Sequence, residues 1–127
     1  MVADSPITDD EIILRHIPGG PAFQQPPGPR ITSANFRLRP GETGVSVSHA
    51  AITSPGLLFT IVGGDLAAGS KLAAALVSDI QALGLVVVPC RTDDDDGHAE
   101  IRSAATDLNK RSVARALAQL FQVVPVP

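Results

Sequence analysis

Residues 57–90 read LLFTIVGGDLAAGSKLAAALVSDIQALGLVVVPC and carry the pattern that decides the fold class. The run at 57–62 is short, apolar and followed by two glycines, which is typical of a buried strand. Over residues 70–83, leucine and isoleucine recur at helical spacing, with Ser70 as a candidate cap and a glycine at the end. The apolar run at 85–90 predicts a second buried strand. The segment therefore predicts a strand–helix–strand unit, typical of a parallel crossover.

Shorter runs on the N-terminal side of this segment predict an antiparallel sheet. The run at 11–17 is rich in isoleucine and stops at Pro-Gly-Gly, which favours a strand over the short helix that a capping box would open. Residues 18–30 hold five prolines and three glycines, so we expect a long extended loop there. The runs at 31–39 and 44–48 flank a Pro-Gly turn sequence and predict a hairpin.

The C-terminal side adds one strand and one helix. Residues 91–97 predict a charged turn, and 98–102 predict a short strand. Apolar residues recur on one stripe of 107–121, which predicts an amphipathic helix. Residues 122–127 are expected to form an extended tail.

The length of 127 residues fits one domain with one core. We expect a single α+β domain at 11–121, preceded by a mobile lead-in at 1–10. Its expected parts are a small, mostly antiparallel sheet, one strand–helix–strand unit and the C-terminal amphipathic helix.

The composition of the chain argues against some kinds of binding partner and indicates its cellular location. The chain has 10 basic and 13 acidic side chains, a formal charge of −3, and 3% aromatic residues, which argues against nucleic-acid binding. No run approaches the ~18 apolar residues of a membrane span. The start of the chain lacks the pattern of a secretory signal, and Cys90 is the single cysteine. We therefore expect a cytoplasmic protein that binds neither nucleic acid nor membrane.

Two stretches resemble ligand-binding motifs and depart from them. Residues 64–71 resemble a phosphate-binding loop, but Lys71 lies one position too late and the hydroxyl that would bind magnesium is missing. The acidic run at 93–96 leads to His98 and Glu100, yet neither a calcium loop nor a zinc deaminase site finds all its ligands there. Adjacent carboxylates are more typical of a solvated turn. We expect neither a cofactor nor a metal.

Arg15, Ser33 and Glu100 follow one another along the chain in an order that resembles the ADP-ribosyltransferases. In that family an early Arg and a Ser-rich segment hold a nicotinamide dinucleotide, and a late Glu stabilises an oxocarbenium-like transition state. The resemblance implies that Arg15 and Ser33 bind the ligand and that Glu100 or His98 performs the chemistry. Only Thr32 extends the Ser segment, and no second acid stands two residues before Glu100. Alternatively, Arg15 pairs with a surface carboxylate.

Other polar residues mark two further candidate sites. Lys110 and Arg111, at the start of the last expected helix, are candidate contacts for an anion, although ordinary surface charge also explains them. Six polar side chains surround a candidate cleft in the N-terminal half: His16, Arg30, Asn35, Arg37, Arg39 and His49.

Several short segments together resemble a set of small bacterial proteins of unknown function. They are an early arginine at Arg15, a Ser-Ala-x-Phe segment at 33–36, a Ser-Val pair at 46–47, and a late His-Ala pair at 98–99. The resemblance spans residues 12–121 and implies a free-standing single domain with no known reaction.

The missing motifs lead us to expect an accessory or interaction protein. It would bind another protein, or a second copy of itself, through apolar edges and the proline-rich loop. The alternative is a small nucleotide-directed enzyme that resembles ADP-ribosyltransferases and uses Arg15, Ser33, His98 and Glu100.

Overall fold

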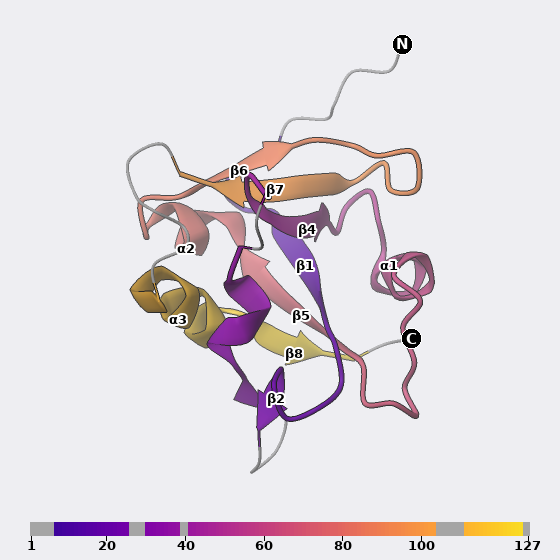
Figure 1. Ribbon diagram of the computed structural model, residues 1–127. Coiled ribbons are helices and arrows are strands. Elements are labelled where there is room, and N and C mark those ends of the chain that lie inside the picture. Colours follow the sequence, from indigo (N-terminus) through magenta and orange to yellow (C-terminus); the bar gives the residue numbers. More distant parts are fainter. Residues whose placement is uncertain (1–6, 26–29, 39–40, 104–110, 126–127) are drawn as a thin grey trace.

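The computed structural model describes residues 7–25, 30–38, 41–103 and 111–125. Within these ranges the chain has an α+β fold with a six-stranded antiparallel sheet and a separate two-stranded ribbon (Figure 1). The strands are β1 (Ile12–Ile17), β2 (Gln24–Gln25), β3 (Arg30–Ile31), β4 (Val45–His49), β5 (Lys71–Leu76), β6 (Val86–Pro89), β7 (His98–Arg102) and β8 (Gln122–Val124). The helices are the 3-10 helix η1 (Ser33–Phe36) and the α-helices α1 (Pro55–Ile61), α2 (Val77–Gln81) and α3 (Arg111–Leu120).

The sheet separates two hydrophobic clusters. Along β1, Ile13 and Ile17 belong to the larger cluster, to which α2, α3 and η1 contribute, whereas Leu14 belongs to the smaller cluster with α1. This alternation follows the two-residue period of a strand whose two faces are both covered. Figure 1 shows α2 and α3 on one side of the sheet and α1 on the other. The ring of Phe36 in η1 packs on Phe121, with 5.0 Å between the centroids.

The strand order is β6-β7-β4-β1-β5-β8, and the sheet opens between two of its central strands. β1 pairs with β5 along all six of its residues. The ladder between β1 and β4 holds only two residue pairs, the second of which joins Leu14 to Ser48. β4 itself stays paired with β7 from Val45 to Ser48. β1 and β4 therefore separate beyond Leu14.

The strand predicted at 57–62 is wrong, because this segment belongs to α1. Pro55 stands in the first turn of the helix, where its missing N–H removes no helical hydrogen bond. The side chain of Ser54 accepts a hydrogen bond from Leu57 N and caps the helix. The Ser-Pro pair before the apolar run is therefore the local signal that places a helix here.

The helix predicted at 70–83 is wrong in its first half, where β5 lies, and only α2 is helical. β5 pairs with β1 on one side and β8 on the other, and these two ladders outweigh the helical preference of an alanine-rich segment. Ser70 precedes a strand and caps no helix. The strand–helix–strand unit is therefore β5–α2–β6. Its strands run in the same direction, with three strands between them.

The hairpin predicted from 31–39 and 44–48 is also wrong. Residues 39–40 lie outside the described residues; before them, β3 pairs with β2, and η1 follows. Asn35 and Phe36 are neighbours in the chain and both buried, an arrangement that a helical turn permits and a strand with one covered face does not. β4 forms its ladders with β1 and β7.

The remaining sequence predictions agree with the structure where it describes them. The strands expected at 11–17, 85–90 and 98–102 are confirmed as β1, β6 and β7. The C-terminal amphipathic helix is confirmed as α3, although residues 107–110 lie outside the described part of the chain.

Two expected loops form strands in part. Of the tail expected at 122–127, Gln122–Val124 joins the sheet as the edge strand β8, and residues 126–127 lie outside the described ranges. In the proline-rich loop, Gln24 and Gln25 pair with β3, while residues 26–29 are outside the described ranges. Residues 1–6 of the expected lead-in are not described either.

Candidate functional site

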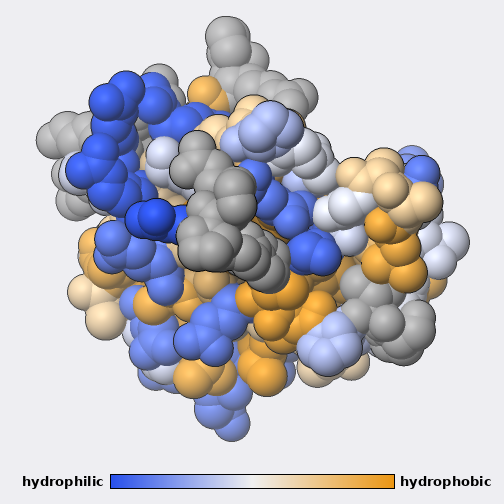
Figure 2. Space-filling model, turned by 90° about the horizontal axis from the view of Figure 1, so that it is seen from below, coloured by the Kyte–Doolittle hydropathy of each residue, from blue (hydrophilic) through white to orange (hydrophobic). Residues whose placement is uncertain are grey.

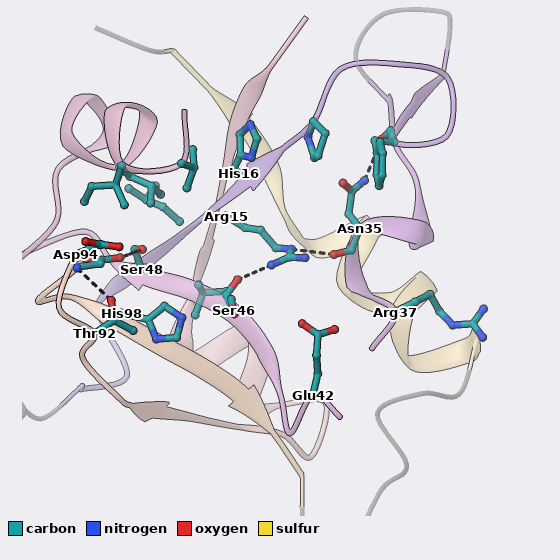
Figure 3. A pocket seen from close by; sticks show the side chains of 18 of the residues that line it. Arg15, His16, Asn35, Arg37, Glu42, Ser46, Ser48, Thr92, Asp94 and His98 are labelled. Carbon is teal, nitrogen blue, oxygen red and sulfur yellow. Dashed lines mark hydrogen bonds between the residues drawn. The ribbon is translucent and has the colours of Figure 1, made fainter. Parts of the chain in front are cut away.

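A cavity lies where β1 and β4 separate. It has a volume of about 410 Å³ and is lined by residues of β1, η1, β4 and α1 and of the loops before β2, β4 and β7 (Figure 3). A cavity of this size is in the range of small-molecule sites. Because both faces of β1 contribute side chains, Arg15 and His16 both line it although they are neighbours in the chain.

Arg15 bridges the gap that the missing ladder leaves. Its Nε donates to the backbone oxygen of Asn35 at 2.8 Å, and its Nη1 donates to the backbone oxygen of Ser46 on β4. The guanidinium carbon lies 5.5 Å from the centroid of the Phe36 ring, in a cation–π contact. One side chain thus holds β1, β4 and η1 around the cavity.

Asn35 lines the cavity and carries a buried acceptor. Only 3% of the residue is exposed, and its Nδ2 donates to the backbone oxygens of Phe23 at 2.9 Å and Thr32 at 3.0 Å. Turning the amide over would set its oxygen against two carbonyl oxygens, so these bonds fix its orientation. Oδ1 has no hydrogen-bond partner within the described ranges.

His16 also lines the cavity, from β1 (Figure 3). Its ring meets Phe59 of α1 edge to face, with 6.5 Å between centroids. Burial, and then the charge of Arg15, lowers the pKa of His16 below its ordinary 6.5, so the ring is neutral at pH 7. Its Nε2 is buried and has no hydrogen-bond partner among the described residues.

The rest of the cavity wall is apolar on one side and charged at the rim. Leu58, Ile61 and Val62 contribute the apolar side from α1 and its end. Arg37 and Glu42 are exposed and lie toward the opposite side in Figure 3. With charges of both signs at the rim, the cavity is not a basic site for an anion.

His98 lines the cavity from the start of β7 and contacts the single cysteine. Its Nδ1 lies 2.9 Å from the backbone oxygen of Cys90 and 3.2 Å from the Cys90 sulfur. An imidazole nitrogen that bonds a carbonyl oxygen carries the proton, so Nδ1 is the donor in the neutral ring. The contact joins the residue after β6 to the first residue of β7 and closes the loop at 91–97.

The sequence predicts that the acidic run at 93–96 forms a solvated turn, and for Asp95 this prediction is wrong. Asp95 is only 5% exposed. Its carboxylate accepts hydrogen bonds from the hydroxyls of Ser48 and Thr53 and from Gly97 N. A Cβ on Gly97 would lie 2.4 Å from Thr53 Oγ1, so only glycine fits this close approach. Asp95 is therefore a structural anchor beside the cavity.

The four residues of the enzyme alternative are divided by the structure. Arg15 and His98 line the cavity, whereas Ser33 and Glu100 are absent from its wall. Glu100 lies across from Ser46 in the sheet, and its Oε1 accepts from Arg102 at 2.7 and 2.8 Å.

Glu100 also accepts from Thr43 Oγ1 at 3.0 Å. Burial alone would raise the pKa of Glu100. The hydrogen bonds from Arg102 and Thr43, together with the charges of Arg102 and His98, lower it by more, so the pKa of Glu100 lies below its ordinary value. The carboxylate is thus ionised and already hydrogen-bonded.

The other sequence candidates are only partly described. Arg111 is exposed at the first residue of α3, and Lys110 lies outside the described residues. Of the expected cleft, His16, Asn35 and Arg37 do line one cavity. His49 lies elsewhere, with its Nε2 2.9 Å from Glu11 Oε2. In residues 7–25, 30–38, 41–103 and 111–125, no three His, Cys, Asp or Glu side chains form a group that would hold a metal ion.

A second hollow of about 340 Å³ lies between the loop before β5 and the end of the chain. Leu66, Lys71 and Val124 contribute to its wall, and it presents no buried unpartnered polar atom of the described residues. Figure 2 shows that hydrophobic residues gather in the middle of one face of the molecule. Leu66 is 64% exposed, the most exposed large hydrophobic side chain among those described.

Comparisons with models of protein families, with curated proteins and with solved structures find no match for the chain. None of the described helices is long and apolar enough to cross a membrane. The cavity between β1 and β4 is therefore the candidate site of this domain.

Proposed function

We propose that this domain is a binding module that holds a small organic molecule in the cavity between β1 and β4. The observation that supports it best is Asn35, a cavity-lining residue that is only 3% exposed and whose buried Oδ1 has no hydrogen-bond partner among the described residues. A buried acceptor without a donor costs free energy in the empty protein, and a bound ligand recovers it. The cavity combines such polar atoms with an apolar wall, the usual composition of a ligand site.

Binding is better supported than catalysis because the polar groups of the cavity already serve the fold. Arg15 donates to two backbone oxygens, and Asp95 accepts from three donors. An enzyme of the type that the Arg15, Ser33 and Glu100 order resembles would gather these groups on one ligand. Only Arg15 of the three lines the cavity.

The proposal keeps the accessory character that we infer from the missing catalytic motifs and replaces the expected protein partner by a small molecule. Interaction with another protein, or with a second copy, stays a prediction. So does the cytoplasmic location.

A fragment titration followed by two-dimensional amide NMR tests the proposal. Fragments that bind should shift amides of β1, η1 and β4 in the wild type. Ser46→Trp should abolish these shifts, because Ser46 is exposed on the cavity wall and an indole there fills the space. The matched control is Ser112→Trp, on the exposed start of α3. Shifts that survive in Ser46→Trp, or no binding fragment at all, would contradict the proposal.

A further inference from the structure

Two buried polar atoms of the cavity wall determine which chemistry can bind there. Asn35 Oδ1 and His16 Nε2 both lack a hydrogen-bond partner among the described residues, and both residues line the same cavity. Most buried polar atoms in folded proteins are hydrogen-bonded, so an unpartnered pair on one wall points to a group that the structure does not contain.

Asn35 selects for a donor. Both hydrogens of its Nδ2 are used on the backbone oxygens of Phe23 and Thr32, so its remaining capacity is acceptance at Oδ1. A carboxylate or phosphate oxygen would face this oxygen with like partial charge. An N–H or O–H group meets it with a hydrogen bond that is sheltered from water.

The surroundings of Asn35 disfavour a charged ligand. The Arg15 guanidinium donates to the backbone oxygen of this same residue, so a cation bound beside it would be repelled. His16 is neutral at pH 7 and adds no positive charge, and the carboxylates of Glu42, Asp94 and Asp95 on the same wall oppose the attraction of an anion to Arg15. The two histidines of the cavity wall differ in their hydrogen bonds. His98 Nδ1 is hydrogen-bonded to the backbone oxygen of Cys90, whereas His16 Nε2 has no hydrogen-bond partner among the described residues.

The shape and polarity of the wall describe the rest of the ligand. Leu58, Ile61 and Val62 form an apolar surface in the same cavity of about 410 Å³. A flat apolar ring gains free energy by leaving water against such a surface.

We infer that the cavity binds an uncharged molecule with an amide or amino N–H donor, directed at Asn35 Oδ1, and an apolar ring against α1. This inference rests on the proposed function and specifies its ligand class. An N–H donor beside the acceptor supplies the missing partner, and the ring covers the apolar wall.

Three probes of similar size isolate the donor: benzamide, acetophenone and benzoate. Acetophenone keeps the ring and the carbonyl oxygen but carries a methyl group in place of the NH2, and benzoate carries oxygen only and a charge. We expect benzamide to bind about tenfold more tightly than either, because a buried acceptor facing a methyl group loses its hydrogen bond. Affinities are measured by amide NMR titration of the wild type.

Asn35→Ala and His16→Phe test whether these residues recognise the N–H donor of the ligand. Asn35→Ala removes the acceptor and should bring the affinity of benzamide down to that of acetophenone. Since this variant also loses two hydrogen bonds of the fold, His16→Phe provides a second measurement that keeps the ring beside Phe59. We expect it to reduce the preference for benzamide, and Arg115→Ala, exposed on α3 and absent from the cavity wall, to leave it unchanged.

Equal affinity for the three probes overturns the inference, since water would then satisfy the two atoms as well as a ligand does. Tighter binding of benzoate overturns it in favour of an anion site, and leaves the binding function standing. If no probe binds while other fragments shift the amides of the cavity, the ligand class is wrong and the cavity still binds. Only a protein to which no fragment binds loses both the inference and the function.

Discussion

At the scale of single residues, the carboxylate of Asp95 joins three segments of the chain. It accepts from Ser48 on β4, from Thr53 before α1 and from Gly97 before β7. Asp95→Ala leaves two hydroxyls without their acceptor and removes one of the two hydrogen bonds of Gly97 N, and we expect it to lower the free energy of unfolding by about 3 kcal/mol. Asp94→Ala, its exposed neighbour, is the control and should change it by less than about 0.5 kcal/mol. Urea unfolding measures both, and equal losses would show that Asp95 is no anchor.

His16 makes the stability depend on pH. Because its pKa lies below 6.5 in the folded protein, the unfolded chain takes up a proton first as the pH falls. Its contribution to stability is therefore complete above pH 6.5 and is lost as the pH falls below that value toward the folded pKa. We expect the urea midpoint to fall between about pH 7.5 and about pH 5.5, and to fall less in His16→Phe.

The comparison with His16→Phe isolates this group, because His49 and His98 remain in both proteins. If the two proteins lose stability in parallel over the same pH range, His16 is not the group that titrates.

At the scale of elements, the separation of β1 from β4 depends on one side chain. Arg15 replaces the absent ladder with hydrogen bonds to β4 and η1. We expect Arg15→Ala to lower the free energy of unfolding by about 2 kcal/mol, since a hydrogen bond from a charged donor contributes roughly that much. Amide hydrogen exchange should accelerate in η1 and β4 and stay unchanged in β8.

Arg15→Lys separates geometry from charge. A lysine keeps the charge, but its single ammonium does not reproduce the planar fork that reaches the oxygens of Asn35 and Ser46 together. It should therefore recover little of the lost stability. Full recovery in Arg15→Lys would show that the charge alone matters, and Arg37→Ala, exposed at the rim, serves as the neutral control.

The elements that the sequence predicts correctly are those whose local pattern and tertiary environment agree. β1 and β6 are short β-branched runs, and α3 carries one apolar stripe. α1 is predicted wrongly although Ser54 and Pro55 form a helix start that is visible in the sequence. β5 has no such signal, because Lys71–Leu76 prefers a helix locally and becomes a strand only between β1 and β8.

The sequence likewise predicts some features of the candidate site and not others. The polar composition of the N-terminal half predicts a cleft with His16, Asn35 and Arg37, and these three line one cavity. The bridging role of Arg15 and the burial of Asp95 depend on where the ladder between β1 and β4 stops, which is a property of the register. No local pattern encodes that register, so neither role follows from the sequence.

At the scale of the whole molecule, the sheet is built almost entirely from distant pairings. Of the strands adjacent in the six-stranded sheet, only β6 and β7 also follow one another in the chain. Every other ladder closes a long loop, and topologies built from such distant pairings fold slowly. The last strand, β8, comes from the end of the described chain and covers one side of β5.

A chain that ends at Phe121 tests the importance of this last pairing. It keeps α3 and loses β8, so the backbone of β5 from Leu72 to Ala74 becomes a free edge. The smaller hydrophobic cluster also loses Val124, which packs against it. An uncovered edge of small and apolar residues pairs readily with another chain. For the chain that ends at Phe121 we therefore expect a lower urea midpoint and concentration-dependent association on size-exclusion chromatography. The control is a chain that ends at Pro125, which keeps β8 and should behave as the full chain does. If both truncated chains stay monomeric and equally stable, β8 contributes nothing to the sheet, and the stability of β5 comes from β1 alone.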